Sequence, residues 1–427
     1  MISEPVFIKC SWRLIPLMFL FYLVSFIDRT NAGFAALTMN RDLGFSPAVF
    51  GFGAGIFFIG YSLFQIPANL MLERIGARRW MFCILAVWGL LSASNALVRT
   101  PGSFYGVRFL LGIAEAGCFP GMLLYLTYWF PRKHLAQFTA LFAVAIPISG
   151  VIGAPLGSSI LTKLDGIAGM HGWQWLFVVE AMPALFLAFV TLRFLPDGPE
   201  HASWLSQDEK KSIAARLEVG GVRSMRGVWR AMRDPRVIAL GVANFSYQSS
   251  GYGVAFWAPQ IVHAMGFSIG TTGFVVALPF IAGSVAMVLC GRSSTMRGEG
   301  ILHASLPWLF AAAAYFVAAH VQSNWIVLLM LVFGATGQNG AFGAFFSLPG
   351  TFLAGSEAAA GIGLFNTLGA VGGFFGPSLV GILRQSSGDY ATGLAAIAIG
   401  FAIAGLIVLG VGRAIEPRPA LQQSAAE

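Results

Sequence analysis

The chain has 427 residues, of which 57% are hydrophobic and only 10% are Asp, Glu, Lys or Arg. A soluble protein carries charge on roughly a quarter of its positions, so this composition excludes a soluble globular fold and indicates an integral membrane protein. The net charge of +8 comes from basic residues between apolar segments, which indicates contact with anionic membrane lipid and excludes nucleic acid as a partner.

Apolar segments long enough to cross the hydrocarbon layer, about 20 residues each, recur along the chain. The first of these carries Asp28 and Arg29 and lacks a small-residue cleavage site, so we expect a permanent helix and no removable signal peptide. We predict an all-α integral membrane fold with twelve transmembrane helices, at residues 14–36, 50–72, 80–98, 103–129, 135–162, 173–194, 236–264, 272–290, 301–319, 324–346, 358–383 and 390–412.

The longest polar interruption, residues 196–233, divides the chain into two six-helix halves. Within it, residues 206–209 have the form of a capping box and predict a short charged helix toward Glu218. Residues 73–76 follow the second predicted helix as residues 295–298 follow the eighth, a repeat typical of secondary carriers. The predicted parts are an N-terminal half (1–195), a cytoplasmic linker (196–235), a C-terminal half (236–415) and a cytoplasmic tail (416–427).

Basic residues also predict the orientation in the membrane, because they concentrate in cytoplasmic segments. If the N-terminus is inside, the predicted outer segments hold only four basic residues, Arg41, Arg99, Lys163 and Arg384. We therefore expect both termini in the cytoplasm and a location in the cell (inner) membrane.

Ionisable side chains within a bilayer are costly and mark substrate or ion pathways by default. Arg29 and Arg108 present planar forks of donors suited to a carboxylate, so we expect them to bind an organic anion. Asp28 and Glu115 lie near the expected midplane, where a carboxyl can exchange protons, so we expect them to couple transport to protons. The alternative is that these four residues form internal ion pairs that hold two helices together. For Glu180 we expect a fixed, hydrogen-bonded acid.

The sequence contains no phosphate-binding loop, and its four cysteines lack metal-ligand spacing. We therefore expect neither an enzyme nor a bound cofactor or metal. A channel would need repeated pore-lining polar residues or an oligomeric filter, which a repeated twelve-helix chain does not suggest. We therefore expect a carrier that acts as a monomer. A membrane sensor or receptor for organic acids is the alternative of a different class.

Several motifs resemble a known family. Residues 69–79 (NLMLERIGARR) resemble the major facilitator superfamily signature G-x-x-x-D-R-x-G-R-R, with Asn in place of Gly and Glu in place of Asp. Residues 26–31 (FIDRTN), 108–117 (RFLLGIAEAG) and 128–131 (YWFP) are similar to the anion:cation symporter family, and residues 51–79 are most similar to its tartrate and phthalate transporters. The resemblance implies a major facilitator fold and a gating motif made of Glu73, Arg74, Gly76, Arg78 and Arg79.

The resemblance also implies proton symport of small organic anions by alternating access. It favours hydroxy dicarboxylates such as tartrate, with aromatic acids and sugar acids as alternatives. The arginine of the fourth helix would bind the substrate carboxylate, and the matching acids would carry protons. Further candidate substrate contacts, for which a packing role is equally open, are Tyr61, Tyr247, Gln248, Phe346 and Asn366.

Overall fold

The computed structural model of the chain describes residues 4–217, 225–353 and 355–415. Within these ranges every regular element is a helix. Helices suit a lipid environment, because each backbone N–H and C=O finds its partner inside its own segment. The all-α prediction is confirmed.

The helices follow the predicted order. In the first half of the chain they are α1 (Pro5–Leu43), α2 (Pro47–Ile75), α3 (Ala77–Ser94), α4 (Pro101–Glu115), α5 (Cys118–Thr127), α6 (Arg132–Lys163) and α7 (Gly172–Phe194). The linker region contains α8 (Gln207–Arg216) and α9 (Met225–Arg233). The second half consists of α10 (Pro235–Ala264), α11 (Ile269–Arg297), α12 (Ile301–His320), α13 (Asn324–Gly340), α14 (Phe342–Ser347), α15 (Gly355–Ser387) and α16 (Ala391–Ile415).

Local sequence signals set several helix starts. The hydroxyl of Ser46 accepts the N–H of Val49 at 3.3 Å and caps α2. The capping box predicted at residues 206–209 is present, because the Ser206 N–H donates to the Glu209 carboxylate at 2.8 Å and the Glu209 N–H donates to the Ser206 hydroxyl oxygen at 3.2 Å. The helix that it opens, α8, ends at Arg216, and Glu218 lies outside the described residues.

Eleven helical segments of the described chain are long and apolar enough to cross a membrane. The twelfth predicted span corresponds to α10, a 30-residue helix that carries Asn244, Gln248 and three serines. Polar side chains in a spanning helix face the protein interior, not the lipid, so α10 still fits a twelve-helix plan.

Two predicted helices are interrupted, which corrects the uninterrupted spans 103–129 and 324–346. The first divides into α4 and α5 at Gly117, where the N–H of Ala116 bonds the Ile113 carbonyl in a tighter turn. The second divides into α13 and α14 at Ala341. Glycine lowers helix stability by about 1 kcal/mol, and Gly117 and Gly340 stand at these breaks.

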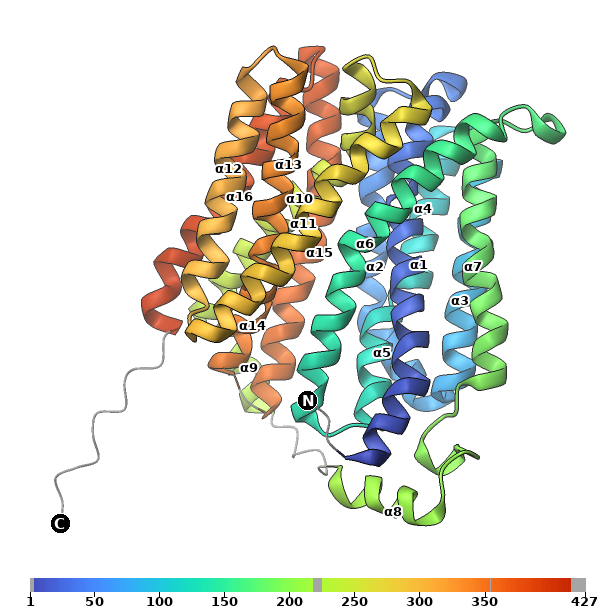
Figure 1. Cartoon of the computed structure of the whole chain (residues 1–427), viewed down its shortest axis with the longest axis vertical. Coiled ribbons are helices and arrows are strands. Elements are labelled where there is room, and N and C mark those ends of the chain that lie inside the picture. The colour runs from blue at the N-terminus through green and yellow to red at the C-terminus, as the bar shows by residue number, and fades with distance from the viewer. Residues whose placement is uncertain (1–3, 218–224, 354, 416–427) are drawn as a thin grey trace. The chain divides into compact units, whose positions relative to one another are not determined.

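The described residues form two compact units. Unit 1 consists of the described residues of Met1–Gly220, Ala255–Ile281 and Pro377–Gly388. Within it, α3 packs on α7, α2 on α4, and α1 on α6 and α7 (Figure 1). Unit 2 contains the rest, and within it α12 packs on α16 and α13.

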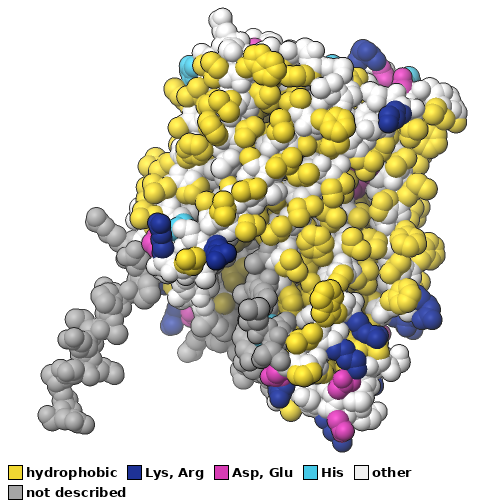
Figure 2. All heavy atoms as spheres, viewed as in Figure 1, with side chains coloured by type: hydrophobic (Ala, Val, Ile, Leu, Met, Phe, Trp, Pro, Cys, Tyr) yellow, Lys and Arg dark blue, Asp and Glu magenta, His cyan; other side chains and the backbone are white. Residues whose placement is uncertain are grey.

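Figure 2 shows one face of the molecule, on which hydrophobic side chains cover most of the surface. Lys and Arg side chains gather near the end where α8 lies. In α7, Phe186 and Phe189 are each 68% exposed. Large apolar side chains exposed to this degree are suited to contact lipid and would be unfavourable in water.

Candidate functional site

Arg108 is a buried cation in the middle of unit 1. The helix that carries it, α4, begins with a capping box at Thr100 and has Arg108 two turns further on, with no exposed surface. None of its three guanidinium nitrogens has a hydrogen-bond partner among the residues that the structure describes. Its guanidinium carbon lies 5.2 Å from the Phe57 ring and 5.8 Å from the Phe256 ring. Arg108 therefore presents unused charged donors in a water-poor, aromatic environment.

Arg29 and Glu115 form an ion pair between α1 and α4. The guanidinium of Arg29 donates to Oε1 of Glu115, and the hydroxyl of Ser25 donates to the same oxygen. Glu115 has no exposed surface, and Arg29 is 5% exposed. The Arg29 guanidinium also lies over the ring of Tyr61 at 5.1 Å. This pair brings together three of the residues predicted from the sequence.

Asp28 occupies a different environment from its neighbour Arg29. Its carboxylate accepts hydrogen bonds from Trp88 Nε1 at 2.6 Å, from Asn31 Nδ2 at 3.1 Å and from the Ser92 hydroxyl. Successive residues point about 100° apart around a helix, so the two side chains diverge. Asp28 therefore faces α3 and is held by neutral donors, a difference from Glu115 that the sequence did not reveal.

Glu180 of α7 lies close to this second cluster. It is 4% exposed, interacts electrostatically with Asp28 and hydrogen-bonds Asn31. The sequence prediction for Glu180, a fixed and hydrogen-bonded acid, agrees with this arrangement. Glu180 and Asp28 thus share one polar cluster between α1, α3 and α7.

Glycines make the Arg108 site possible by allowing close helix contact. A Cβ atom on Gly112, one turn after Arg108, would overlap the carbonyl oxygen of Phe57, and one on Gly60 would overlap the carbonyl of Phe109. The backbones of α2 and α4 therefore touch beside the site. This contact places Phe57 and Tyr61 of α2 against the arginines of α1 and α4.

The four candidates of the second half belong to unit 2. Tyr247 is 5% exposed, stacks on Trp308 at 4.8 Å and meets the edge of Phe346 at 6.2 Å. Gln248 is half-buried on α10, and Asn366 is exposed on α15. Tyr247 and Phe346 are therefore joined in one aromatic cluster, whereas Gln248 and Asn366 have no contact with it that the structure records.

The motif predicted to act in gating makes a connection inside unit 1. Arg78 donates through Nε to the Leu192 carbonyl at 2.6 Å, at the end of α7. Its backbone N–H donates to Asp197 at 2.9 Å, and this carboxylate lies against Gly76, whose φ of 90° favours glycine. Arg74 and Arg79 are exposed, and the side chain of Glu73 is outside the described part of the chain. The motif thus joins α3 to the segment after α7.

Sequence reasoning missed five residues that complete the two clusters. They are apolar or weakly polar residues in hydrophobic helices, where they look like ordinary packing residues: Ser25, Phe57, Trp88, Ser92 and Phe256. In the described residues, no group of three His, Cys, Asp or Glu side chains is placed to hold a metal ion.

Comparison with known proteins establishes the family. A family model described as Major Facilitator Superfamily matches residues 18–377. The chain belongs to the major facilitator superfamily. This membership confirms the twelve-helix fold and the prediction that the protein is a transporter and not an enzyme.

Relatives in this superfamily cover nearly the whole chain. A protein of Agrobacterium vitis named "Putative tartrate transporter" is 43% identical over 97% of this chain and 94% of its own length. The inner membrane transport protein RhmT of Escherichia coli K12 is 35% identical over 95% of each chain. The chain also superimposes on the crystal structure of a bacterial homolog of the human lysosomal transporter Spinster, with a TM-score of 0.79. The match covers 98% of this chain and 100% of the other, at 17% sequence identity, and reflects a common fold.

Proposed function

We propose that this protein is a proton-coupled symporter of small organic anions, acting on hydroxy dicarboxylates such as tartrate by alternating access. The observation that carries this proposal is Arg108, a buried guanidinium with unused donors. A buried guanidinium whose donors find no acceptor in the described residues is unfavourable, and a substrate carboxylate would supply the acceptors. Similarity to proteins named as tartrate transporters favours a dicarboxylate, with aromatic acids and sugar acids as alternatives.

The Arg29–Glu115 pair supplies the coupling in this proposal. While Glu115 is ionised, it occupies the Arg29 guanidinium. A proton on Glu115 removes that counter-charge, so Arg29 joins Arg108 in presenting about two positive charges in a low-dielectric site. Protons and anions then raise each other's affinity, because linkage is reciprocal. A substrate with two carboxylates matches two arginines.

Asp28 is the second proposed coupling acid. Its three recorded partners are neutral donors, so its proton can be exchanged without breaking a direct ion pair. The gating residues Arg78 and Gly76 would act through the connection between α3 and the end of α7. Tyr61, Tyr247, Gln248, Phe346 and Asn366 remain proposed substrate contacts.

We also propose that both termini are cytoplasmic, in the cell (inner) membrane, and that the monomer is functional. The basic side chains near α8 support this orientation, because cytoplasmic segments carry the excess of Lys and Arg (Figure 2). The proposed organisation keeps residues 196–235 as the linker between two six-helix halves, with anionic lipid on the cytoplasmic side.

Purified protein in proteoliposomes tests this function. We expect saturable uptake of labelled tartrate that rises when an inward proton gradient is imposed. The Glu115→Gln variant should still exchange substrate across the membrane yet fail to accumulate it. Glu200→Gln, an equivalent change at an exposed position, serves as the control.

Two outcomes would contradict the proposal. Accumulation by Glu115→Gln at the parental level would remove Glu115 from the coupling mechanism. Binding of organic acids without any uptake by the parent protein would favour the sensor or receptor alternative instead.

A further inference from the structure

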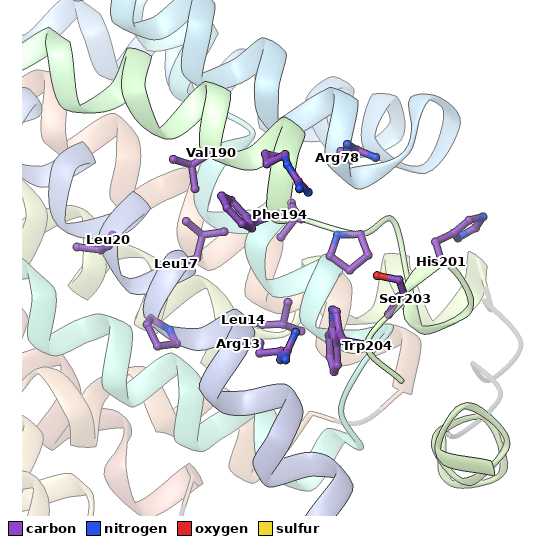
Figure 3. Close-up of a pocket in the computed structure, with 15 residues that line it drawn as sticks. Arg13, Leu14, Leu17, Leu20, Arg78, Val190, Phe194, His201, Ser203 and Trp204 are labelled. Atoms are coloured by element: carbon purple, nitrogen blue, oxygen red, sulfur yellow. The ribbon is translucent and has the colours of Figure 1, made fainter. Parts of the chain in front are cut away.

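A cavity of about 660 Å³ lies in unit 1, between α1, α7 and the segment that follows α7 (Figure 3). Four of the side chains that line it are basic: Arg13, Arg78, Arg193 and His201. No Asp or Glu is among the lining residues that the structure describes. This volume falls within the range of about 300–1,000 Å³ that is usual for small-molecule sites. The cavity therefore has the size of a binding site and an excess of positive charge.

The wall of the cavity is fixed by interactions outside it. Trp204 stacks on the fully buried Trp129, with ring centroids 5.6 Å apart and an interplanar angle of 9°. The hydroxyl of Tyr125 donates to the Pro196 carbonyl at 2.8 Å. These contacts hold the segment after α7 against the helices of unit 1. The cavity is therefore a preformed feature of the fold.

Two of the arginines are available to a ligand. Arg78 donates to the Leu192 carbonyl and is occupied. Arg13 lies over the ring of Trp204 at 4.9 Å, and Arg193 lies over the ring of Phe194 at 5.5 Å. Neither forms an ion pair with a carboxylate in the described residues. Both keep donors for an anion.

The other side of the cavity is apolar. Leu20 and Phe194 line it and are 44% and 66% exposed, and the phenylalanines Phe186 and Phe189 earlier on α7 are also exposed, at 68% each. Figure 3 shows Leu17, Leu20 and Val190 on one side, and His201 and Ser203 on the other. The lining is thus amphipathic, with apolar side chains of α1 and α7 on one side and Arg78 with the segment after α7 on the other.

We propose that this cavity binds the phosphate headgroup of an anionic phospholipid from the leaflet on the linker side. The headgroup would lie among the basic side chains of the lining, which include Arg13 and Arg193, while an acyl chain would lie along Leu20 and Phe194. A free phosphate ion shares the charge but has no group for the apolar side. A zwitterionic lipid shares the chain but has no net charge to match the arginines. Both sides of the cavity together therefore specify an anionic lipid.

Protein in an uncharged detergent provides the test. Short-chain phosphatidylglycerol is titrated against it, with phosphatidylcholine of the same chain length and inorganic phosphate as parallel arms. Thermal unfolding and native mass spectrometry report stabilisation and stoichiometry. We expect phosphatidylglycerol to raise the unfolding midpoint with one tightly retained lipid, and the other two ligands to have little effect.

Variants locate the site. Arg13→Gln and Arg193→Gln should each weaken phosphatidylglycerol binding by about fivefold, the usual contribution of one basic residue near an anionic lipid. Arg99→Gln changes an exposed arginine at the start of α4 and should leave binding unchanged. Ser203→Trp fills the cavity from an exposed position and should abolish binding. This variant keeps the test decisive if an arginine variant does not fold.

Three results would each overturn the proposal. Equal stabilisation by phosphatidylcholine would show that charge is not recognised. Equal stabilisation by phosphate would identify a water-soluble anion as the ligand. Full binding by Ser203→Trp and both arginine variants would place the lipid elsewhere.

Discussion

Replacement of Arg108 by alanine tests the centre of the proposed site. A hydrogen bond to a charged group contributes about 1.5–3 kcal/mol, and two such bonds to one carboxylate give about 3 kcal/mol or more. The side chain has no exposed surface, so water has no access to replace the lost donors. A loss of about 3 kcal/mol corresponds to roughly a hundredfold weaker substrate binding. Arg108→Lys keeps the charge but loses the planar fork, and we expect an intermediate effect.

Isothermal titration and thermal unfolding of the purified variant measure this effect. The ligand-free protein should remain folded. Arg108 has no hydrogen-bond partner in the described structure, so its removal leaves no acceptor unpaired. The rise in unfolding midpoint on adding substrate should disappear. Arg99→Ala, which removes an exposed arginine, is the matched control. Substrate binding by folded Arg108→Ala at the parental affinity would refute the reasoning.

Three further predictions concern other parts of the chain. Gly112→Leu should force α2 and α4 apart, lower the free energy of unfolding by about 1–3 kcal/mol and abolish substrate binding. Gly102→Leu, a position with open space around the Cβ, should be tolerated in the same thermal unfolding measurements. Deletion of residues 220–223 should leave uptake largely intact, since the sequence predicts that this part of the linker is outside the membrane. Complete loss in a well-expressed deletion would make the linker part of the gate. The Ser206 backbone N–H and Lys9 hold the pKa of Glu209 below its ordinary value, so the ionised carboxylate stabilises the fold. The Glu209→Gln variant should therefore be less stable than the parent at pH 7, and the difference should vanish as the pH falls below about 4. An equal loss of stability at both pH values would contradict this.

The sequence predicted the helices well because lipid imposes a simple rule on composition. Each apolar run had to be a helix, and the basic residues between runs separated the elements. The interruptions at Gly117 and Ala341 were missed, because a break inside an apolar run changes neither length nor hydropathy. Even α10 was predicted from its length between charged segments, although its polar residues lower its hydropathy.

The charged residues of the site were also predictable, since a charge within a membrane helix is conspicuous. Their partners were not, because pairing depends on tertiary contacts over long sequence separations. Nothing local shows that Asp28 bonds Trp88 on α3, or that Arg29 turns toward Glu115 on α4. From the sequence we predicted equivalent roles for Asp28 and Glu115. In the described structure Glu115 has a direct arginine partner, whereas the recorded partners of Asp28 are neutral donors.

The indole of Trp88 gives the protein a built-in optical reporter. This ring is fully buried, and its N–H donates directly to Asp28 at 2.6 Å. The electric field at an indole depends strongly on a charge at hydrogen-bond distance in a low-dielectric interior. A change of protonation at Asp28 would therefore shift the absorption and emission of Trp88. The chain has 11 tryptophans, so a variant that keeps Trp88 and lacks the other ten would report the occupancy of this proposed proton site.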